Sequence, residues 1–411
     1  MYITSAFKKD ENLDVIPILI IFSALFFINP LLGILGLIFK LRNNVQNDKL
    51  YYGFYALISL YFGLINITRI PEGDFLSYKK MFDSAGSLTF LSYMSKFQQE
   101  YFFYVATYVF NKILFGNFKL YVILLTFLQY YLYFISIHKY FKNNGKHILL
   151  FAIALTALNL PLFFSSVHLL RQMTALSIFI YYFIEKIVNK NNKWWLIVIA
   201  VLIHSSSLLL FLLTFIPTLR YRVRLKSIVI IGFTVVFILL FGTWFINLLH
   251  KLTMGISWLN YPIMMFKSLK TLDTTWYHGQ DAESIRSSYL KYILLPAIIV
   301  YLSGRLQQRY YYLLNFIFAY IIILEIFMFS NLLFMQLRMS FYSRIFSPFA
   351  IAILIFVLKK RTNSSISDLG ISIFLLYFIA KYAVNYIDTS FGIARLDEIL
   401  LSSVPMYFNY R

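Results

Sequence analysis

The feature that most constrains this sequence is a series of continuous apolar runs, each about twenty residues long. One of them reads "WWLIVIAVLIHSSSLLLFLLTFI", from Trp194 to Ile216. A helix of about twenty residues spans the roughly 30 Å hydrocarbon core of a bilayer. Strands of a membrane barrel are shorter and alternate in polarity, so the runs predict helices. We therefore expect an all-α, polytopic integral membrane protein.

The composition agrees with this expectation. Of the 411 residues, 60% are hydrophobic and only 13% are charged, whereas soluble domains carry about 25% charged residues. The runs predict about 11–13 transmembrane helices in a single transmembrane domain of residues 1–411. The candidate spans lie near residues 16–40, 50–68, 100–117, 119–140, 148–166, 167–188, 194–216, 227–249, 288–303, 310–330, 345–358 and 369–385.

The net charge of +20 resides in short clusters between apolar runs, such as "KLRNN", "RYRVRLK" and "KKR". This is the pattern of cytoplasmic loops, and it argues against nucleic acid as a partner. Two longer connections, 69–99 and 250–287, then face the periplasm. If all twelve candidate spans cross the membrane, the basic loops 139–147 and 186–193 lie on the periplasmic side, where basic loops are not expected. One segment between 100 and 217 is therefore predicted not to cross fully.

Several chemistries are disfavoured. The chain contains no cysteine, which excludes disulfides and thiol catalysis. It has no glycine loop of the Walker or dinucleotide type and no histidine spacing typical of a metal site. We expect neither a metal nor a cofactor, and a nucleotide-sugar donor held by a divalent ion is disfavoured. The polar start leads into an apolar run without a small-residue cleavage site, so no cleavable signal peptide is expected.

Two polar groups interrupt neighbouring apolar runs. On one helix, His168, Arg171, Gln172 and Ala175 would form one stripe. His204 lies on the helix that follows the short loop "VNKNNK". Counted from this loop, Arg171 lies roughly 24 Å along its helix and His204 roughly 17 Å along the partner. Both are predicted to lie near the face opposite the Lys-rich loop. The alternatives are a snorkelling anchor for Arg171 and a packing role for His204.

Carboxylates in the first long connection are further candidates. Asp74, Tyr78 and Phe82 are four residues apart, so a short helix lying on the membrane would show them on one face. Glu100 precedes the run "YFFYVATYVF", where its charge would lie at the positive end of a helix. Solvated loop charges or an N-terminal cap are the alternatives for both carboxylates.

Arginines gather late in the chain. The stretch "FMQLRMSFYSRIFSPF" places Arg338 and Arg344 at a span entrance beside Tyr342. Guanidinium groups bind phosphate oxygens in bidentate fashion, and several together suit a pyrophosphate. Arg286 and Arg305 are expected nearby, and interfacial anchoring is the alternative for each arginine. The aromatic residues of the second long connection are candidates for stacking on sugars or for an interfacial belt: Trp258, Tyr261, Trp276 and Tyr277.

The succession Asp74-x-x-x-Tyr78, Glu100 before a span, "LRQMTA" and "IHSSS" resembles the EpsG-like family of Wzy-type membrane polysaccharide polymerases. The resemblance covers roughly 70–215 well and the rest mainly by hydropathy. The residues at matching places are Arg171, Gln172, Thr174, Ala175, His204 and Ser206. "RMSFYSR" is similar to a later Arg-and-Tyr segment, although less specifically.

The resemblance implies a GT-C-like glycosyltransferase of the bacterial inner membrane with its active site facing the periplasm. Such a protein makes O-antigen, lipopolysaccharide or exopolysaccharide chains by moving a growing glycan from undecaprenyl pyrophosphate onto a new lipid-linked repeat unit. The expected partners are these repeat units, membrane lipids and a chain-length regulator protein. His204, Asp74 and Glu100 are then the catalytic candidates. The candidates for binding pyrophosphate or substrate are Arg171, Gln172, Arg338, Arg344, Tyr78 and Tyr342.

Other functions remain open. A flippase or another transporter for lipid-linked oligosaccharides would also need a basic cavity. An O-antigen ligase or a membrane acyltransferase would use similar residues. The absence of an internal repeat disfavours a transporter, and two long loops on one side favour an enzyme with a one-sided active site.

Overall fold

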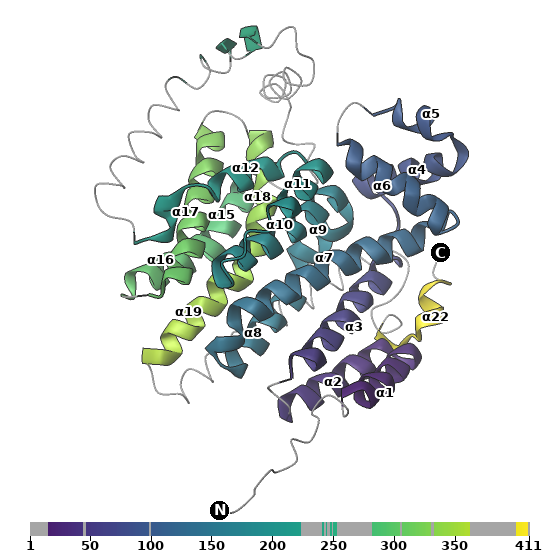
Figure 1. Ribbon diagram of the computed structural model, residues 1–411, viewed down its shortest axis with the longest axis horizontal. Helices are drawn as coiled ribbons and strands as arrows, with labels where there is room; N and C mark the ends of the chain where they lie inside the picture. The colour runs from purple at the N-terminus through teal and green to yellow at the C-terminus, as the bar shows by residue number, and fades with distance from the viewer. Residues whose placement is uncertain are drawn as a thin grey trace, which may run out of the picture.

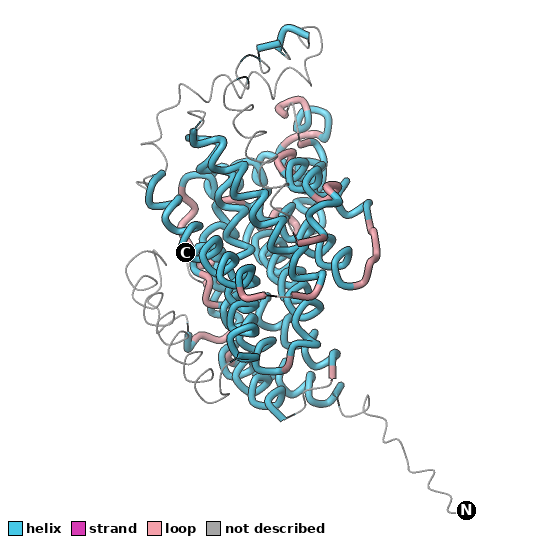
Figure 2. The backbone as a smooth tube through the Cα atoms, turned by 90° about the vertical axis from the view of Figure 1, so that its left-hand side faces the viewer, coloured by secondary structure: helices cyan, strands magenta, loops and turns pink. Residues whose placement is uncertain are grey.

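The computed structural model of the chain is built from helices, and the part that it describes contains no strand (Figure 2). Apart from scattered positions between 241 and 252, the described residues are 15–43, 47–97, 100–222, 282–304, 306–329, 333–361 and 400–409. The second long connection, 250–287, and the candidate spans near 227–249 and 369–385 therefore lie largely or wholly outside the described residues. The described part is that of an all-α membrane protein.

Figure 1 shows a bundle with a smaller group of helices at one side. The first half of the chain forms α1 (Val15–Ile28), α2 (Pro30–Asn43), α3 (Asp48–Asn66), α4 (Gly73–Ser87), α5 (Phe90–Met94), α6 (Tyr101–Ile113), α7 (Phe118–Phe141), α8 (Lys146–Ala157), α9 (Leu160–His168), α10 (Leu170–Val188), α11 (Trp194–Ile203) and α12 (Ser207–Leu213). The second half contributes α15 (Ala282–Tyr289), α16 (Leu295–Leu302), α17 (Gln308–Phe329), α18 (Leu333–Ser343), α19 (Ser347–Arg361) and α22 (Val404–Tyr407). We call α4, α5 and α6 the lobe.

Among the described residues, three helical segments are long and apolar enough to cross a membrane: Phe118–Asn144, Gln308–Met328 and Met339–Lys360. A fourth candidate is the pair Lys146–Ala157 and Leu162–His168, which is bent by 48°. Close helix contact supports this arrangement. A Cβ atom at Gly63 of α3 would lie only 3.1 Å from backbone atoms of Ile123 on α7. Small residues let membrane helices approach in this way.

The candidate span 16–40 is wrong as a single crossing. The chain breaks at Asn29, whose side-chain oxygen accepts a hydrogen bond from the backbone N–H of Leu32 at 3.1 Å. Pro30 opens α2, a position that suits proline because its missing N–H has no partner in a first helical turn. A Cβ at Gly33 would meet Phe26, and one at Gly36 would meet Phe22. This reversed pairing identifies α1 and α2 as a helical hairpin.

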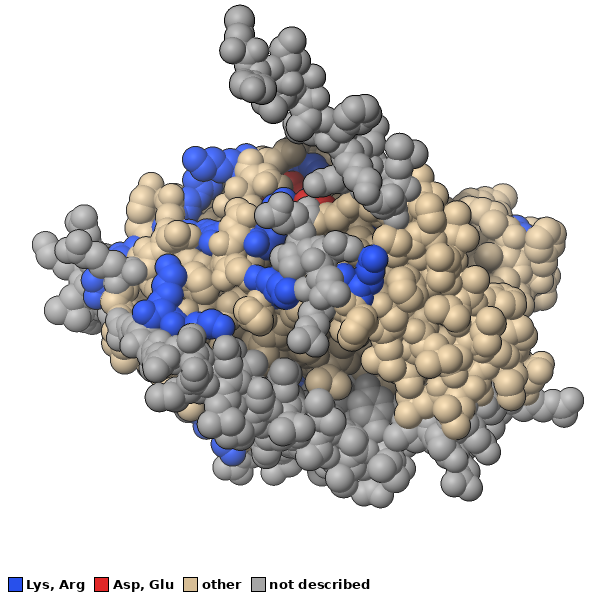
Figure 3. Space-filling view, turned by 90° about the horizontal axis from the view of Figure 1, so that it is seen from below, with Lys and Arg blue, Asp and Glu red and all other residues tan. Residues whose placement is uncertain are grey.

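Ion pairs and a hydrogen bond place four chain segments at one end of the bundle, which we call the basic face. Lys139 at the end of α7 pairs with Glu185 near the end of α10. Asp48 at the start of α3 pairs with Lys142 at 3.3 Å. Arg309 at the start of α17 donates to the Asn144 side chain at 2.8 Å. In Figure 1 this face lies at the bottom, and Figure 3 looks onto it and shows its lysines and arginines. The loops 139–147 and 186–193 thus share one side with the start of α3 and the start of α17.

Two of the spans predicted between 100 and 217 do not cross: 100–117, which is the 13-residue helix α6 of the lobe, and 194–216, which is the pair α11–α12. Its helices have 10 and 7 residues, about 15 and 11 Å, against roughly 30 Å for a crossing. α11 starts from the loop at the basic face. The end of α12 returns to the same side, because Lys186 near the end of α10 donates to the backbone oxygen of Thr214 at 3.1 Å. The sequence predicted a full span at 194–216, and the structure corrects it to a hairpin whose tip is His204–Ser206.

Candidate functional site

The site is centred on Glu100, which joins the lobe to the bundle. Glu100 precedes α6 in the left-handed conformation, with φ 58° and ψ 35°, and makes no side-chain cap. Its side chain is only 5% exposed. One carboxylate oxygen accepts a hydrogen bond from Arg171 Nη1 at 2.5 Å. The other accepts from the Ser205 backbone N–H at 3.3 Å and is bonded to His204 Nδ1. The expected helix cap is therefore replaced by contacts to α10 and to the α11–α12 tip.

The carboxylate of Glu100 is ionised at neutral pH. Burial raises the pKa of Glu100, but the hydrogen bonds and charges of His204 and Arg171 outweigh burial and leave this pKa below its ordinary value. Glu100 therefore contributes a fixed negative charge. This charge is matched by the guanidinium group of Arg171.

Arg171 lies in the first turn of α10 and reaches toward the lobe. Besides Glu100, its Nη1 donates to the Tyr104 hydroxyl at 3.0 Å. Its guanidinium carbon lies 5.7 Å from the centre of the Tyr78 ring and 5.8 Å from that of Tyr104. These are cation–π distances. The side chain is thus held from three sides and is 28% exposed.

His204 ends α11, in an extended conformation with φ −152° and ψ 116°. The sequence placed it within a helix, but the run of serines after it makes the turn into α12, because serine competes for backbone hydrogen bonds and favours helix ends. Its Nδ1 faces Glu100. Nε2 is therefore the ring nitrogen that is left for a group in the pocket. A carboxylate on one imidazole nitrogen fixes the tautomer and the ring orientation.

These groups border a pocket of about 90 Å³. Its lining residues are Asp74, Ser77, Tyr78, Leu169, Arg171, Gln172 and His204. The lobe supplies the first three, and the bundle supplies the others. Tyr78 is buried, whereas Asp74 and Ser77 are exposed at the start of α4. The expected helix with Asp74, Tyr78 and Phe82 therefore forms, and two of its three side chains pack inward.

The predicted stripe from His168 to Ala175 is interrupted. α9 ends at His168 and α10 begins at Leu170, with Leu169 at φ −119° and ψ 44°. His168 thus belongs to another helix than Arg171. Thr174 accepts a hydrogen bond from Gln129 of α7 at 3.1 Å, and Ala175 is fully buried. These two residues pack α10 against α7, while Arg171 and Gln172 face the pocket.

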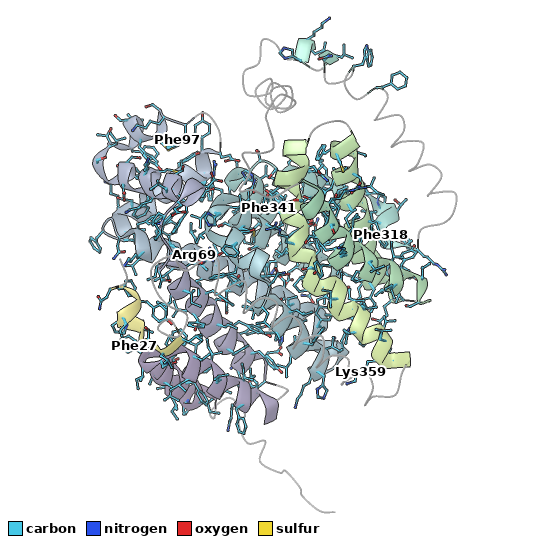
Figure 4. The ribbon with its side chains drawn as sticks, turned by 180° about the vertical axis from the view of Figure 1, so that it is seen from behind. Phe27, Arg69, Phe97, Phe318, Phe341 and Lys359 are labelled. Atoms are coloured by element: carbon cyan, nitrogen blue, oxygen red, sulfur yellow. The ribbon has the colours of Figure 1, made fainter. Side chains whose placement is uncertain are left out.

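Arg286 and Arg344, the late arginines whose side chains the structure describes, do not line this pocket. Arg344 lies over the Phe341 ring, 4.2 Å from its centre, and Figure 4 shows Phe341 between the two halves of the bundle. Arg286 is paired with Glu325, to which its Nη2 donates at 2.8 Å. The Arg338 side chain lies outside the described residues, as do Arg305 and the aromatic residues Trp258, Tyr261, Trp276 and Tyr277. Tyr342 does connect to the site, because its hydroxyl is bonded to that of Ser206.

Sequence reasoning missed Tyr104 and the Ser205 N–H as partners of the site. Helical spacing is no signal for Tyr104, because Glu100 lies outside α6 in the left-handed conformation. The Ser205 N–H is free to bond only because α11 breaks at His204, and no periodicity marks that break. Among the described residues, no three His, Asp or Glu side chains are close enough to hold a metal ion.

The fold and the site together define a multi-pass helical membrane protein with a small polar pocket remote from its basic face. The sequence profile of the EpsG family matches residues 51–396. Because this match covers most of the chain, the protein belongs to the EpsG family. Membership supports a role like that of a polysaccharide polymerase, a membrane glycosyltransferase with lipid-linked glycans as substrates. No curated protein and no solved structure matches the chain.

Proposed function

We propose that this protein polymerises lipid-linked repeat units at the periplasmic face of a bacterial inner membrane, within a GT-C-like architecture. The donor is a growing glycan on undecaprenyl pyrophosphate, and the acceptor is a sugar hydroxyl of a new repeat unit. A chain-length regulator is its expected partner. The observation that carries the proposal is the Glu100–His204 contact beside Arg171 on a pocket remote from the basic face.

The proposed reaction is a direct transfer. The acceptor hydroxyl oxygen forms a bond to the anomeric carbon of the donor sugar, and the bond from that carbon to the pyrophosphate oxygen breaks. The electron pair leaves with the lipid pyrophosphate. The hydroxyl proton passes to His204 Nε2, since Nδ1 is engaged by Glu100. Glu100 orients the imidazole and stabilises its protonated form.

The leaving pyrophosphate needs cationic partners of its own. Arg338 and Arg344 are our candidates, with Tyr342 between them in the sequence. Support comes from the bond between the Tyr342 and Ser206 hydroxyls, because it ties α18 to the tip that carries His204. Guanidinium groups suit this task, since they bind phosphate oxygens in bidentate fashion.

The test is polymer production by a strain whose only copy of the gene carries His204→Ala or Arg171→Ala. We expect loss of long-chain polymer and accumulation of the lipid-linked single repeat, with normal insertion of the protein. The matched controls are His147→Ala and Arg222→Ala, two exposed residues outside the pocket, which should leave the polymer unchanged.

Two outcomes contradict the proposal. Full-length polymer from either pocket variant would remove the residue from the chemistry. Single repeats that accumulate only on the cytoplasmic side would identify a flippase instead.

A further inference from the structure

The charge of the pocket points away from a pyrophosphate. The positive charge of Arg171 is matched by Glu100, which it contacts at 2.5 Å. Asp74 adds a second carboxylate to the lining, and none of the described residues forms a hydrogen bond or ion pair with it. The charges of Arg171, Glu100 and Asp74 therefore sum to a net negative charge. A pyrophosphate, which is itself an anion, is repelled from such a site.

Gln172 offers a more specific observation. Its side chain lines the pocket and is 8% exposed. Its Oε1 atom is buried and accepts no hydrogen bond from the described residues. Buried polar atoms are nearly always hydrogen-bonded in folded proteins, so this acceptor lacks a donor. A pyrophosphate oxygen only accepts hydrogen bonds at neutral pH, whereas a sugar hydroxyl or an acetamido N–H donates them.

The remaining walls suit one sugar. Tyr78 lines the pocket with an aromatic ring, and the Asp74 carboxylate accepts hydrogen bonds from hydroxyl groups. The pocket volume of about 90 Å³ is well below the roughly 300–1,000 Å³ of pockets that enclose a whole drug-sized ligand. It suits part of one terminal sugar better than an oligosaccharide chain.

We propose that the pocket is the subsite for the acceptor sugar, in which Gln172 and Asp74 select an uncharged sugar through its hydroxyl or acetamido donors. This inference rests on the proposed function. It makes Arg171 a positioning residue, which holds Glu100 and through it His204. The acceptor hydroxyl then lies beside His204 Nε2, and the pyrophosphate of the donor binds outside this pocket.

The test uses the absence of cysteine from the chain. Ser77→Cys places a single thiol on the pocket lining, in the purified full-length protein. The rate of its alkylation by a maleimide is measured with free neutral hexoses, with N-acetylhexosamines and with inorganic pyrophosphate. We expect at least one neutral sugar to slow alkylation in a saturable manner, and pyrophosphate to have no effect. Ser95→Cys, an exposed thiol elsewhere on the lobe, should be insensitive to all of them.

A second variant makes the role of Gln172 testable. Gln172→Met keeps the size of the side chain but removes the acceptor. In the Ser77→Cys background, it should weaken sugar protection about two- to tenfold, the effect of losing one neutral hydrogen bond. The acceptor subsite would be overturned if only pyrophosphate slowed alkylation of the Ser77→Cys thiol. It would also be overturned if none of the tested compounds slowed it. Sugar protection combined with normal polymer from His204→Ala would keep the subsite and reject the proposed chemistry.

Discussion

Glu100 decides the geometry of the site at the scale of single residues. The sequence identified Glu100, Arg171 and His204 separately, because charged or titratable groups next to apolar runs are conspicuous. Helix rise predicted that Arg171 and His204 lie near the same face, but the contact of both with Glu100 was not predictable from spacing. Arg171 follows Glu100 by 71 positions and His204 follows it by 104. The contacts depend on the left-handed conformation of Glu100 and on the break in the helix at His204. Both are local backbone features that hydrophobic patterns do not encode.

The lowered pKa of Glu100 predicts a specific acid sensitivity. A carboxyl whose folded pKa is depressed adds stability that is fully present above its unfolded pKa of about 4.3 and is lost as pH falls through the folded value. Glu100→Gln removes this contribution, roughly 1.5–3 kcal/mol for each charged hydrogen bond lost. We therefore expect wild-type stability to approach that of Glu100→Gln only below about pH 4.3.

The measurement is the thermal midpoint of the purified protein from pH 3 to pH 8. Glu72→Gln, at an exposed carboxyl on the same lobe, is the control and should follow the wild type. Coincident curves for wild type and Glu100→Gln across this range would show that the ion pairs do not stabilise the fold.

Lysine substitutions separate the roles of the arginines. Lysine keeps the positive charge but loses the planar guanidinium group that forms paired hydrogen bonds. Each charged hydrogen bond lost costs roughly 1.5–3 kcal/mol. If the loss falls on the transition state, the reaction slows about ten- to a hundredfold. We expect Arg171→Lys to be severely impaired, because lysine lacks the planar guanidinium group. Its side chain cannot both hold Glu100 and stack on Tyr78 and Tyr104. At least one of Arg338→Lys and Arg344→Lys should be impaired as well.

The measurement is the initial polymerisation rate of each lysine variant with a synthetic lipid-linked repeat. Arg309→Lys at the basic face serves as the control for a structural arginine. If all three lysine variants work at near wild-type rates, Arg171 does not position Glu100, and the assignment of Arg338 and Arg344 to the pyrophosphate fails.

At the scale of elements, the tip of α11–α12 depends on one contact with α18. The Tyr342 hydroxyl is bonded to Ser206, two residues after His204. Tyr342→Phe should leave insertion intact but lower the polymerisation rate more than overall stability, because it releases the tip. Tyr320→Phe is the matched control. It removes another buried tyrosine hydroxyl, which donates to the backbone oxygen of Met339 at 2.6 Å, without touching the tip.

Rate and thermal midpoint are measured for both variants. Equal losses of rate in the two tyrosine variants would contradict a special role for the tip. The sequence predicted most of the helices but merged two broken ones into spans. Asn29–Pro30 was a readable signal for the α1–α2 turn, whereas the serines after His204 are equally compatible with a continuous membrane helix.

The basic face organises the whole molecule. Because lysines and arginines are retained in cytoplasmic loops, we expect this face to be cytoplasmic and residues 69–99 and 250–287 to be periplasmic. Single cysteines at Ser84 and Gln280 should react with a membrane-impermeant thiol reagent in spheroplasts. A cysteine at Asn191, an exposed position in the loop at the basic face, should react only after lysis. The reverse labelling pattern would place the basic face in the periplasm and the two long connections in the cytoplasm.

The conflict between basic loops in the sequence arose because three segments that were counted as crossings do not cross. A strict count treated 16–40, 100–117 and 194–216 as full crossings. In the structure the first and last are hairpins, and the middle one is the 13-residue helix α6 of the lobe. The all-α membrane class followed from composition, which is a property of the whole chain. The number of crossings did not, because apolar length alone does not distinguish a crossing from a hairpin.

The pocket is shared between two parts of the molecule, with Asp74, Ser77 and Tyr78 on the lobe and Arg171, Gln172 and His204 on the bundle. Glu100 is the residue that joins them. An inhibitor of this protein therefore need not imitate a glycan. A compound wedged between lobe and bundle would separate Asp74 from His204 and stop synthesis while the pocket itself stayed empty. Such a compound and the sugar would exclude one another without sharing any contact, so its potency would still fall as the substrate accumulates.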